Sequence, residues 1–507
     1  MAESSHPRLL RWAHSVLQPG FEGTTVPDWV RRRISEGLAS VVLFARNLHG
    51  PEQVAGLTTA LYAENPGLVV AIDEEAGDVT RLEARTGASR PGNLALGALD
   101  DIDVTEQVAR DVGRELHGLG ITLTYAPSAD VNTNPLNPVI GVRSFGARTD
   151  VVSRHAAAWV RGLQSAGVAA CAKHFPGHGD TVVDSHDGLP QVSADAGTLA
   201  LTALPPFIAA MDAGVRAVMT AHLLVPAYDS RWPATLSRPV VGDLLRGELG
   251  FTGLVVTDAV EMGAVADRYG VTGAAVRAVA AGADAVCVGG GNADEATAAR
   301  LADALVSAVL DGRLPEQRLA EAAERVREFA EWAGTLRRSA PEPRDAPGIG
   351  LAAARRAVHV HHGPDRGTQF PLVGSPHVVE LSPATTIAID PATPWGVAEP
   401  LKTLRPGTTS VRLGERQLQD GDEVLDRLAL RPARGRPLVV VVRDAARYGW
   451  MARALAGLVR RRPDALVVEM GVPAGERPGA VYLATHGATR VSGIAAAEVL
   501  VGRTGPA

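Results

Sequence analysis

The chain has 507 residues and a formal net charge of -6, with 50 Lys plus Arg against 56 Asp plus Glu. A chain of this length exceeds one ordinary domain, so two domains are expected. The basic residues form no long run that would follow a phosphate backbone, which argues against a nucleic-acid partner. The two cysteines, Cys171 and Cys287, lie in apolar runs and are expected to be buried thiols in a reducing compartment.

Two features of the sequence indicate where in the cell the protein is expected: its amino-terminal stretch and the distribution of its apolar residues. Residues 1–20 contain charged side chains and no continuous apolar core of signal-peptide length. No run of about 18 apolar residues occurs, so membrane insertion is not expected. We therefore expect a cytoplasmic protein.

Short β-branched runs recur along the first part of the chain, each followed by an alanine-rich stretch of helical period. The runs cover residues 40–45, 68–73, 121–127, 168–175, 216–222, 253–259 and 283–290. Their apolar residues are continuous rather than alternating, as strands covered on both faces require. We predict an α/β fold whose parallel strands close into a TIM-type (β/α)8 barrel. A doubly wound open sheet shares the strand count and is the alternative.

A proline-rich segment follows this predicted barrel. Residues 337–350, with the sequence RRSAPEPRDAPGIG, contain three prolines and predict a linker. Beyond it, apolar runs again alternate with helix-like segments. We therefore predict a barrel domain over residues 1–336 and a smaller α/β sandwich domain over residues 351–507.

The stretch KHFPGHGDTVVDSHDGLP, residues 173–190, carries three histidines and three aspartates. A metal site, an acid/base pair and a histidine-rich polar loop are the possible interpretations. The glycines and proline exclude a helix that would fix two histidine ligands one turn apart. The first predicted strand is also not followed by the His-x-His pair typical of zinc-dependent barrel hydrolases. No metal and no other cofactor is therefore expected, while glycines at 177 and 179 keep the loop interpretation open.

Asp184 and His186 stand two residues apart in the same stretch. In an extended or turn segment both side chains can project to one side. The carboxylate can then hold one imidazole nitrogen while the other nitrogen faces a ligand. This arrangement favours an acid/base dyad.

Several predicted strands end in a polar residue. These residues are Asp73, Lys173 with His174, His222 and Asp258. In a barrel such positions share the rim at the carboxyl ends of the strands, where a site is built. Asp258 follows an otherwise apolar strand, a costly place for a carboxylate unless it meets a partner or reacts. We predict a nucleophile there, with a cap of the next helix as the alternative.

Several motifs along the predicted barrel resemble those of a known protein family. The motifs that carry the resemblance are LFARN, IDEEAGDVTRL, NPVIGVRSFG, KHFPGHGDTVVDSHDGLP, VMTAHLLVPAYD and VVTDAVEM, in the family's order and spacing. They resemble the family 3 glycoside hydrolases, and specifically the bacterial β-N-acetylglucosaminidase (β-hexosaminidase) branch. The resemblance implies a catalytic barrel, retention of anomeric configuration, a covalent glycosyl intermediate on Asp258, and His186 assisted by Asp184 as general acid/base.

The same resemblance implies a set of substrate-binding residues. These are Asp73, which grips sugar hydroxyls, Arg81 and Arg143 at the sugar subsite, and the pair Lys173 and His174. Two positions depart from the family pattern. Where the family usually has Glu-Gly-Gly and a basic residue, this chain has Glu75, Ala76, Gly77 and Asp78, and Ala259 stands where a second acidic residue is common. These departures affect the expected contacts of that loop and the fine substrate preference.

The expected activity is hydrolysis of terminal, non-reducing β-linked N-acetylglucosamine from small glycans. Cell-wall (muropeptide) fragments or chitin oligosaccharides are the expected substrates, and the sequence indicates no oligomeric state. Two alternatives remain open. A histidine acid/base does not repel a phosphate dianion as a carboxylate does, so phosphate could replace water. A catalytically silent sugar-binding protein on the same scaffold is the other, because fold alone does not secure function.

Overall fold

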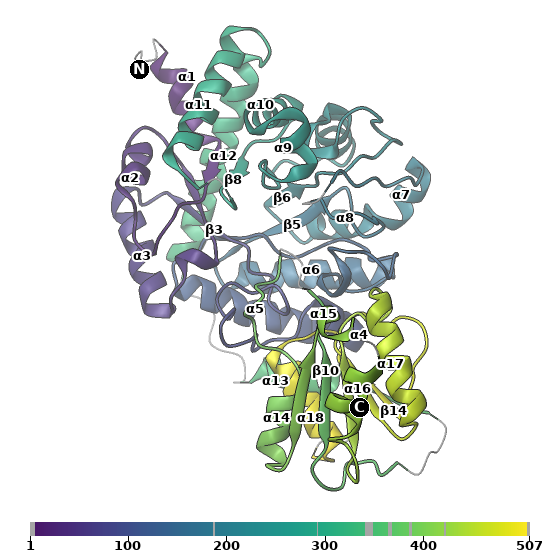
Figure 1. The fold of residues 1–507 in the computed structure, drawn as a ribbon. Coiled ribbons are helices and arrows are strands. Elements are labelled where there is room, and N and C mark those ends of the chain that lie inside the picture. Colours follow the sequence, from purple (N-terminus) through teal and green to yellow (C-terminus); the bar gives the residue numbers. More distant parts are fainter. Residues whose placement is uncertain are drawn as a thin grey trace. The chain divides into compact units, whose positions relative to one another are not determined.

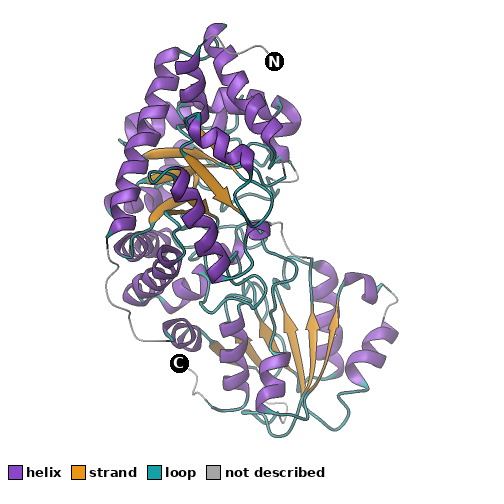
Figure 2. Cartoon of the chain, turned by 90° about the vertical axis from the view of Figure 1, so that its left-hand side faces the viewer, coloured by secondary structure: helices purple, strands orange, loops and turns teal. Residues whose placement is uncertain are grey.

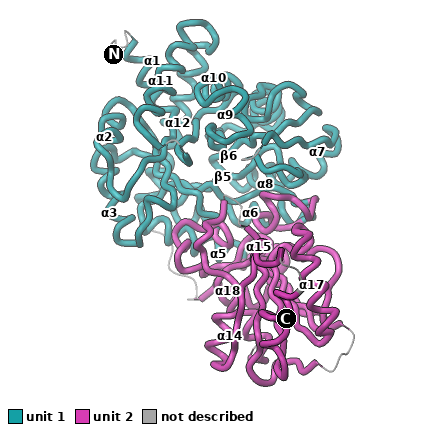
Figure 3. The backbone as a smooth tube through the Cα atoms, viewed as in Figure 1, with its two compact units in different colours: residues 1–75, 105–132, 147–345 teal, residues 76–104, 133–146, 346–507 magenta. Residues whose placement is uncertain are grey.

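The computed structural model describes residues 6–185, 188–291, 293–339, 348–363, 368–384, 388–419 and 422–503. The chain forms two compact units, coloured separately in Figure 3. Unit 1 comprises residues 1–75, 105–132 and 147–345, and unit 2 comprises residues 76–104, 133–146 and 346–507. Unit 2 therefore takes two segments from within the sequence of the predicted barrel.

Unit 1 alternates strands and helices (Figure 1). Its strands are β1 (Leu17–Pro19), β2 (Ser40–Leu43), β3 (Val69–Ile72), β4 (Leu123–Thr124), β5 (Ala169–Phe175), β6 (Ala217–Thr220), β7 (Leu254–Thr257) and β8 (Val286–Val288). Its helices are α1 (Pro7–Ser15), α2 (Asp28–Ser35), α3 (Pro51–Glu64), α5 (Ile102–Gly118, which begins in unit 2), α6 (Thr149–Ser165), α7 (Ala196–Thr202), α8 (Pro205–Asp212), η4 (Pro239–Glu248), α9 (Gly263–Tyr269), α10 (Val271–Ala281), α11 (Glu295–Leu310) and α12 (Glu316–Arg338).

The strands of unit 1 are parallel and follow one another in chain order. β2 to β7 form a continuous ladder, and β8 pairs with β1. A bridge between Val256 and Ala285 connects β7 to the β8 region, and the Ser40 hydroxyl donates to the Leu17 carbonyl at 3.1 Å between β1 and β2. A doubly wound sheet would reverse its strand order at a switch point. The observed order is that of an irregular barrel, as predicted.

Helix α12 supplies apolar side chains to the interior of this barrel. Val326, Phe329, Ala330 and Ala333 belong to the same buried cluster as residues of the strands. The Trp332 ring lies 5.4 Å from the guanidinium of Arg216, which directly precedes β6. Helix α12 therefore lies at the amino-terminal ends of the strands, and the carboxyl ends are the opposite rim, where barrel sites are built.

Unit 2 contains a six-stranded sheet of order β11-β10-β12-β13-β14-β9, drawn in orange at the lower right of Figure 2. The strands are β9 (His359–His362), β10 (His377–Leu381), β11 (Thr409–Leu413), β12 (Leu438–Val442), β13 (Leu466–Glu469) and β14 (Val481–Ala484). The helices are α4 (Asn93–Leu99), α13 (Ile349–Arg356), α14 (Ala398–Leu404), α15 (Glu415–Leu418), α16 (Asp422–Leu425), α17 (Gly449–Arg461) and α18 (Arg490–Leu500). Among the described strands of this sheet, only β9 is antiparallel to its neighbour.

Both faces of this sheet are covered, as expected for an α/β sandwich. Val439 and Val441 of β12 pack in one cluster with residues of α13, α14 and α18. Val440 and Val442 point to the other face and pack with residues of α17. Strands buried on both faces explain the continuous apolar run LVVVV. Most of the predicted linker, residues 340–347, lies outside the described residues, so the predicted domain limits stay predictions.

Candidate active site

Lys173, in β5, is at the centre of a buried charge cluster in unit 1. Its Nζ lies 2.6 Å from Oδ1 of Asp73, which follows β3, and 2.6 Å from Oε1 of Glu75. The side chains of Lys173 and Glu75 are 2% and 3% exposed, whereas that of Asp73 is 22% exposed. A buried ammonium requires such paired carboxylates. Because Lys173 pairs with both carboxylates, Lys173 and Glu75 fix the more open Asp73.

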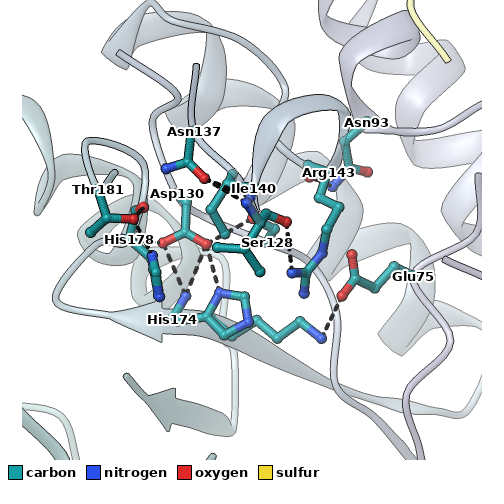
Figure 4. Close-up of polar contacts among 12 residues, drawn as sticks. Glu75, Asn93, Ser128, Asp130, Asn137, Ile140, Arg143, His174, His178 and Thr181 are labelled. Atoms are coloured by element: carbon teal, nitrogen blue, oxygen red, sulfur yellow. Dashed lines mark hydrogen bonds and ion pairs between the residues drawn. The ribbon is translucent and has the colours of Figure 1, made fainter. Parts of the chain in front are cut away.

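Asp130, located after β4, organises the histidines of the 173–190 stretch (Figure 4). Its Oδ2 is 2.7 Å from His174 Nδ1, and its Oδ1 accepts the His178 N–H at 2.6 Å. The Ser128 hydroxyl also donates to it at 3.0 Å. Burial alone would raise the pKa of Asp130, but His174, His178 and these hydrogen bonds outweigh it and hold that pKa below the usual value. Asp130 thus fixes the orientation of the His174 ring.

His178 is buried in the same loop and is not suited to carry a charge. Burial and the nearby His174 lower the pKa of His178 to about 4. Its Nδ1 lies 2.8 Å from the Thr181 hydroxyl, which donates to the His178 carbonyl at 3.1 Å. We interpret His178 as a neutral, structural part of this loop.

Asp258 directly follows β7 and is half-buried. Its Oδ1 accepts the N–H of Ala259 at 2.8 Å, and its own N–H donates to the Thr220 carbonyl of β6 at 3.2 Å. The following helix, α9, is capped at Met262. Asp258 is therefore not the residue at the cap of that helix, and its role as nucleophile stays a prediction.

The segment containing Asp184 is anchored beside the Asp258 loop. The N–H of Ala264, in the first turn of α9, donates to the Ser185 carbonyl at 3.1 Å. Asp184 is half-buried, and its carbonyl accepts the Gly188 N–H at 3.1 Å. His186 lies outside the described residues. The backbone thus connects the predicted dyad segment to the helix that follows the predicted nucleophile.

His222 and Glu261 connect the rim further. His222, which follows β6, places Nε2 3.0 Å from the Ala259 carbonyl and Nδ1 2.9 Å from the Thr235 hydroxyl. Because a carbonyl accepts only, Nε2 carries a proton in this contact. Oε1 of Glu261 accepts the N–H groups of Gly289, at 2.7 Å, and Gly290, directly after β8. These contacts connect the loops that follow β6, β7 and β8.

The remaining predicted residues, Arg81 and Arg143, belong to unit 2. Arg81 donates from Nη1 to the Ala388 carbonyl at 2.7 Å. Arg143 is 8% exposed and donates from Nη1 to the Val139 carbonyl at 3.1 Å, while its own carbonyl accepts the Asn93 side-chain amide at 2.6 Å. The predicted site residues are thus divided between the two units, and their assignment as a site stays a prediction.

Sequence reasoning missed Asp130, which comes after the predicted strand of residues 121–127 and ends the segment APSAD, residues 126–130. An aspartate in such a small-residue segment was the available signal. In the described part of the chain, no group of three or more His, Cys, Asp or Glu side chains is arranged to hold a metal ion. Among the same residues, no helix is long and apolar enough to cross a membrane.

The family model for the glycosyl hydrolase family 3 N terminal domain matches residues 25–329. The chain belongs to glycosyl hydrolase family 3. "Beta-hexosaminidase A" of Pseudoalteromonas piscicida is 39% identical over 286 residues, which are 52% of this chain and 47% of that protein. The match therefore spans about half the length of that relative.

Two other similar proteins are covered over nearly their whole length. "Beta-hexosaminidase" of Chromobacterium violaceum is 34% identical over 367 residues, 70% of this chain and 96% of that protein. The solved structure of a family 3 β-N-acetylglucosaminidase from Paenibacillus sp. str. FPU-7 has a TM-score of 0.84 and 32% identity, covering 98% of this chain and 97% of that one. The predicted fold class and the prediction of a family 3 glycoside hydrolase related to β-hexosaminidases are confirmed.

Proposed function

We propose that this family 3 enzyme is a retaining exo-β-N-acetylglucosaminidase that releases terminal β-linked N-acetylglucosamine from small glycans. Cell-wall fragments or chitin oligosaccharides in the cytoplasm are the proposed substrates. The hexosaminidase names of the similar proteins support the sugar. The observation that carries the proposal is the hydrogen bond from Ala264 to Ser185, which anchors the Asp184 segment to the helix following Asp258.

In the proposed mechanism, the Asp258 carboxylate attacks the anomeric carbon while His186 protonates the glycosidic oxygen. The bond to the leaving group breaks and a glycosyl ester of Asp258 forms. His186 then removes a proton from water, which attacks the same carbon and frees Asp258. Asp184 orients the imidazole and stabilises its charged form. Asp73, fixed by Lys173, accepts hydrogen bonds from sugar hydroxyls.

The first test replaces the proposed nucleophile. Asp258→Ala should abolish release of nitrophenol from the aryl β-N-acetylglucosaminide while the protein stays folded. The matched control is Asp294, which caps α11 through the Thr297 N–H at 2.6 Å. Asp294→Ala should keep kcat and lose only about 1 kcal/mol of stability. More than a few per cent of activity in a folded Asp258→Ala protein would contradict the proposal.

The second test concerns the dyad. His186→Ala should slow a substrate with a poor leaving group severely and a dinitrophenyl glycoside far less, because the latter needs little protonation. Asp184→Ala should act through the same step, so the double variant should be little worse than the worse single one. Full additivity, or equal losses across the leaving-group series, would remove the dyad from the mechanism. Accumulation of a sugar 1-phosphate in phosphate buffer would show phosphorolysis in place of hydrolysis.

A further inference from the structure

Asp78, which departs from the pattern of the resembled family, has a complementary partner in unit 2. Its Oδ2 lies 2.7 Å from Nη2 of Arg443, and its Oδ1 accepts the Ala488 N–H at 2.9 Å. The side chains of Asp78 and Arg443 are 2% and 7% exposed. An acidic residue at position 78 is thus satisfied by a residue 365 positions further along the chain.

Asp78 lies near the start of a segment that contacts the carboxyl-terminal part of unit 2 at several positions. We call residues 76–104 the first arm. Its Arg81 donates to the Ala388 carbonyl at 2.7 Å. The carbonyls of Gly87 and Ala88 accept from Arg490 Nε at 3.2 Å and from the Val491 N–H at 3.3 Å. The first arm therefore takes its conformation from the sandwich sheet and its helices.

The second arm, residues 133–146, is connected to the first. Asn93 donates to the Arg143 carbonyl at 2.6 Å. Gly97 lies so close to the Phe145 carbonyl oxygen that a Cβ there would approach it to 1.8 Å. Arg143 also lines a small pocket with Arg443 and other residues of unit 2. A shift of the first arm would therefore move the backbone that carries Arg143.

Arg443 is itself held in place by its neighbours. It directly follows β12, and its guanidinium lies 5.7 Å from the Trp395 ring centroid. The next residue, Asp444, has a φ of 58° and accepts the Val472 N–H at 2.7 Å. Its own N–H donates to Glu469 at 2.8 Å. Arg443 can therefore serve as a fixed point for the first arm.

We propose that Arg443 is a positioning residue for substrate binding: through Asp78 it holds the first arm, and with it Arg81 and Arg143, in the conformation that binds the terminal sugar. Removing one partner of a buried ion pair leaves an uncompensated charge, so the arm should open locally. Arg443 would not touch the sugar. The expected change in KM rests on the proposed function, whereas the expected opening of the first arm does not.

The test uses Arg443→Gln and Arg443→Lys in the full chain, with Arg462→Gln as control. Arg462 is also in unit 2, where it pairs with Asp464 at 2.7 Å and donates to the Ala433 and Arg436 carbonyls. Neither Arg462 nor Asp464 contacts the arms through a hydrogen bond or ion pair known for the described residues. KM and kcat are measured with the aryl β-N-acetylglucosaminide, and amide hydrogen exchange is measured over residues 76–104.

Arg443→Gln should raise KM about tenfold with kcat nearly unchanged, and exchange in the first arm should become about tenfold faster. Arg443→Lys should recover part of both effects, because it keeps the charge opposite Asp78 but not the planar guanidinium near the Trp395 ring. Arg462→Gln should change neither KM nor the exchange rate. Unchanged exchange in Arg443→Gln, or an equal rise of KM in the control, would overturn the proposal. If the unmodified protein does not cleave the glycoside, the proposed function fails, and hydrogen exchange alone decides whether Arg443 holds the arm.

Discussion

Asp130 in unit 1 and Glu469 in unit 2 are both buried carboxylates that follow or end a parallel strand. Both accept backbone N–H groups, and Glu469 accepts those of Asp444, Ala445 and Gly471. The pKa of Asp130 is nevertheless lowered, whereas burial and the nearby Asp444 raise the pKa of Glu469 to about 8. The difference lies in the neighbours: His174 and His178 lie beside Asp130, whereas the acidic Asp444 lies beside Glu469. Backbone donors alone do not keep a buried carboxyl group ionised.

The largest effect that tests this comparison is expected from Asp130→Asn. The substitution removes the charge opposite His174 and places an amide against several donors, so it should cost about 3 kcal/mol of unfolding free energy near neutral pH. Glu469→Gln should cost much less under the same conditions, because Glu469 is largely protonated below its pKa of about 8. Urea unfolding of both variants provides the measurement. Equal losses would contradict the comparison.

A second test is the pH dependence of the unfolding free energy that Glu469 contributes. Its folded pKa of about 8 exceeds the usual glutamate value of 4.5, so the folded state binds the proton more tightly. The stabilisation from this group is complete below about pH 4.5 and is lost as the pH rises through about 8. Relative to the unmodified protein, Glu469→Gln should therefore gain unfolding free energy continuously between these limits. A difference that stays constant with pH would show that Glu469 does not titrate as proposed.

A further test of the comparison uses the loss of stability at acid pH, to which one buried histidine in each unit contributes. Burial lowers the pKa of both His178 in unit 1 and His486 in unit 2 to about 4. The two histidine pKa values thus shift in the same direction, whereas those of the two carboxylates shift in opposite directions. Each histidine stabilises the fold above pH 6.5, and this contribution is lost as the pH falls towards 4. His486 has a φ of 58°, which asparagine tolerates well. His486→Asn should therefore reduce the loss of unfolding free energy between pH 6.5 and pH 4, and an unchanged loss over this range would refute the prediction.

The sequence predicted seven of the barrel strands because their apolar runs are continuous. It did not predict β1, with the sequence LQP, because a glutamine and a proline interrupt any apolar pattern. Gln18 is buried there and accepts the Tyr125 hydroxyl at 2.7 Å. Strand β9, HVHH, is an edge strand with mostly exposed side chains and lacks a strand pattern for that reason.

The rim residues Asp73, Lys173, His174 and Asp258 were predicted because they end apolar runs. The assignment of Arg81 and Arg143 to unit 2 could not be predicted, since it depends on contacts across hundreds of residues, such as that of Asp78 with Arg443. Local periodicity contains no information on such pairs. The sequence therefore predicts candidate reactive side chains, but it does not predict the long-range contacts that hold those side chains in place.

The two cysteines in the barrel interior can be used to measure how often the barrel opens. Cys171 and Cys287 are buried in the cluster that α12 completes, and burial raises the pKa of both thiols well above the usual value. A protonated, enclosed thiol reacts slowly with alkylating reagents, because the thiolate is the nucleophile. The rate of alkylation at these two positions therefore measures how often the barrel opens, without any label having to be introduced.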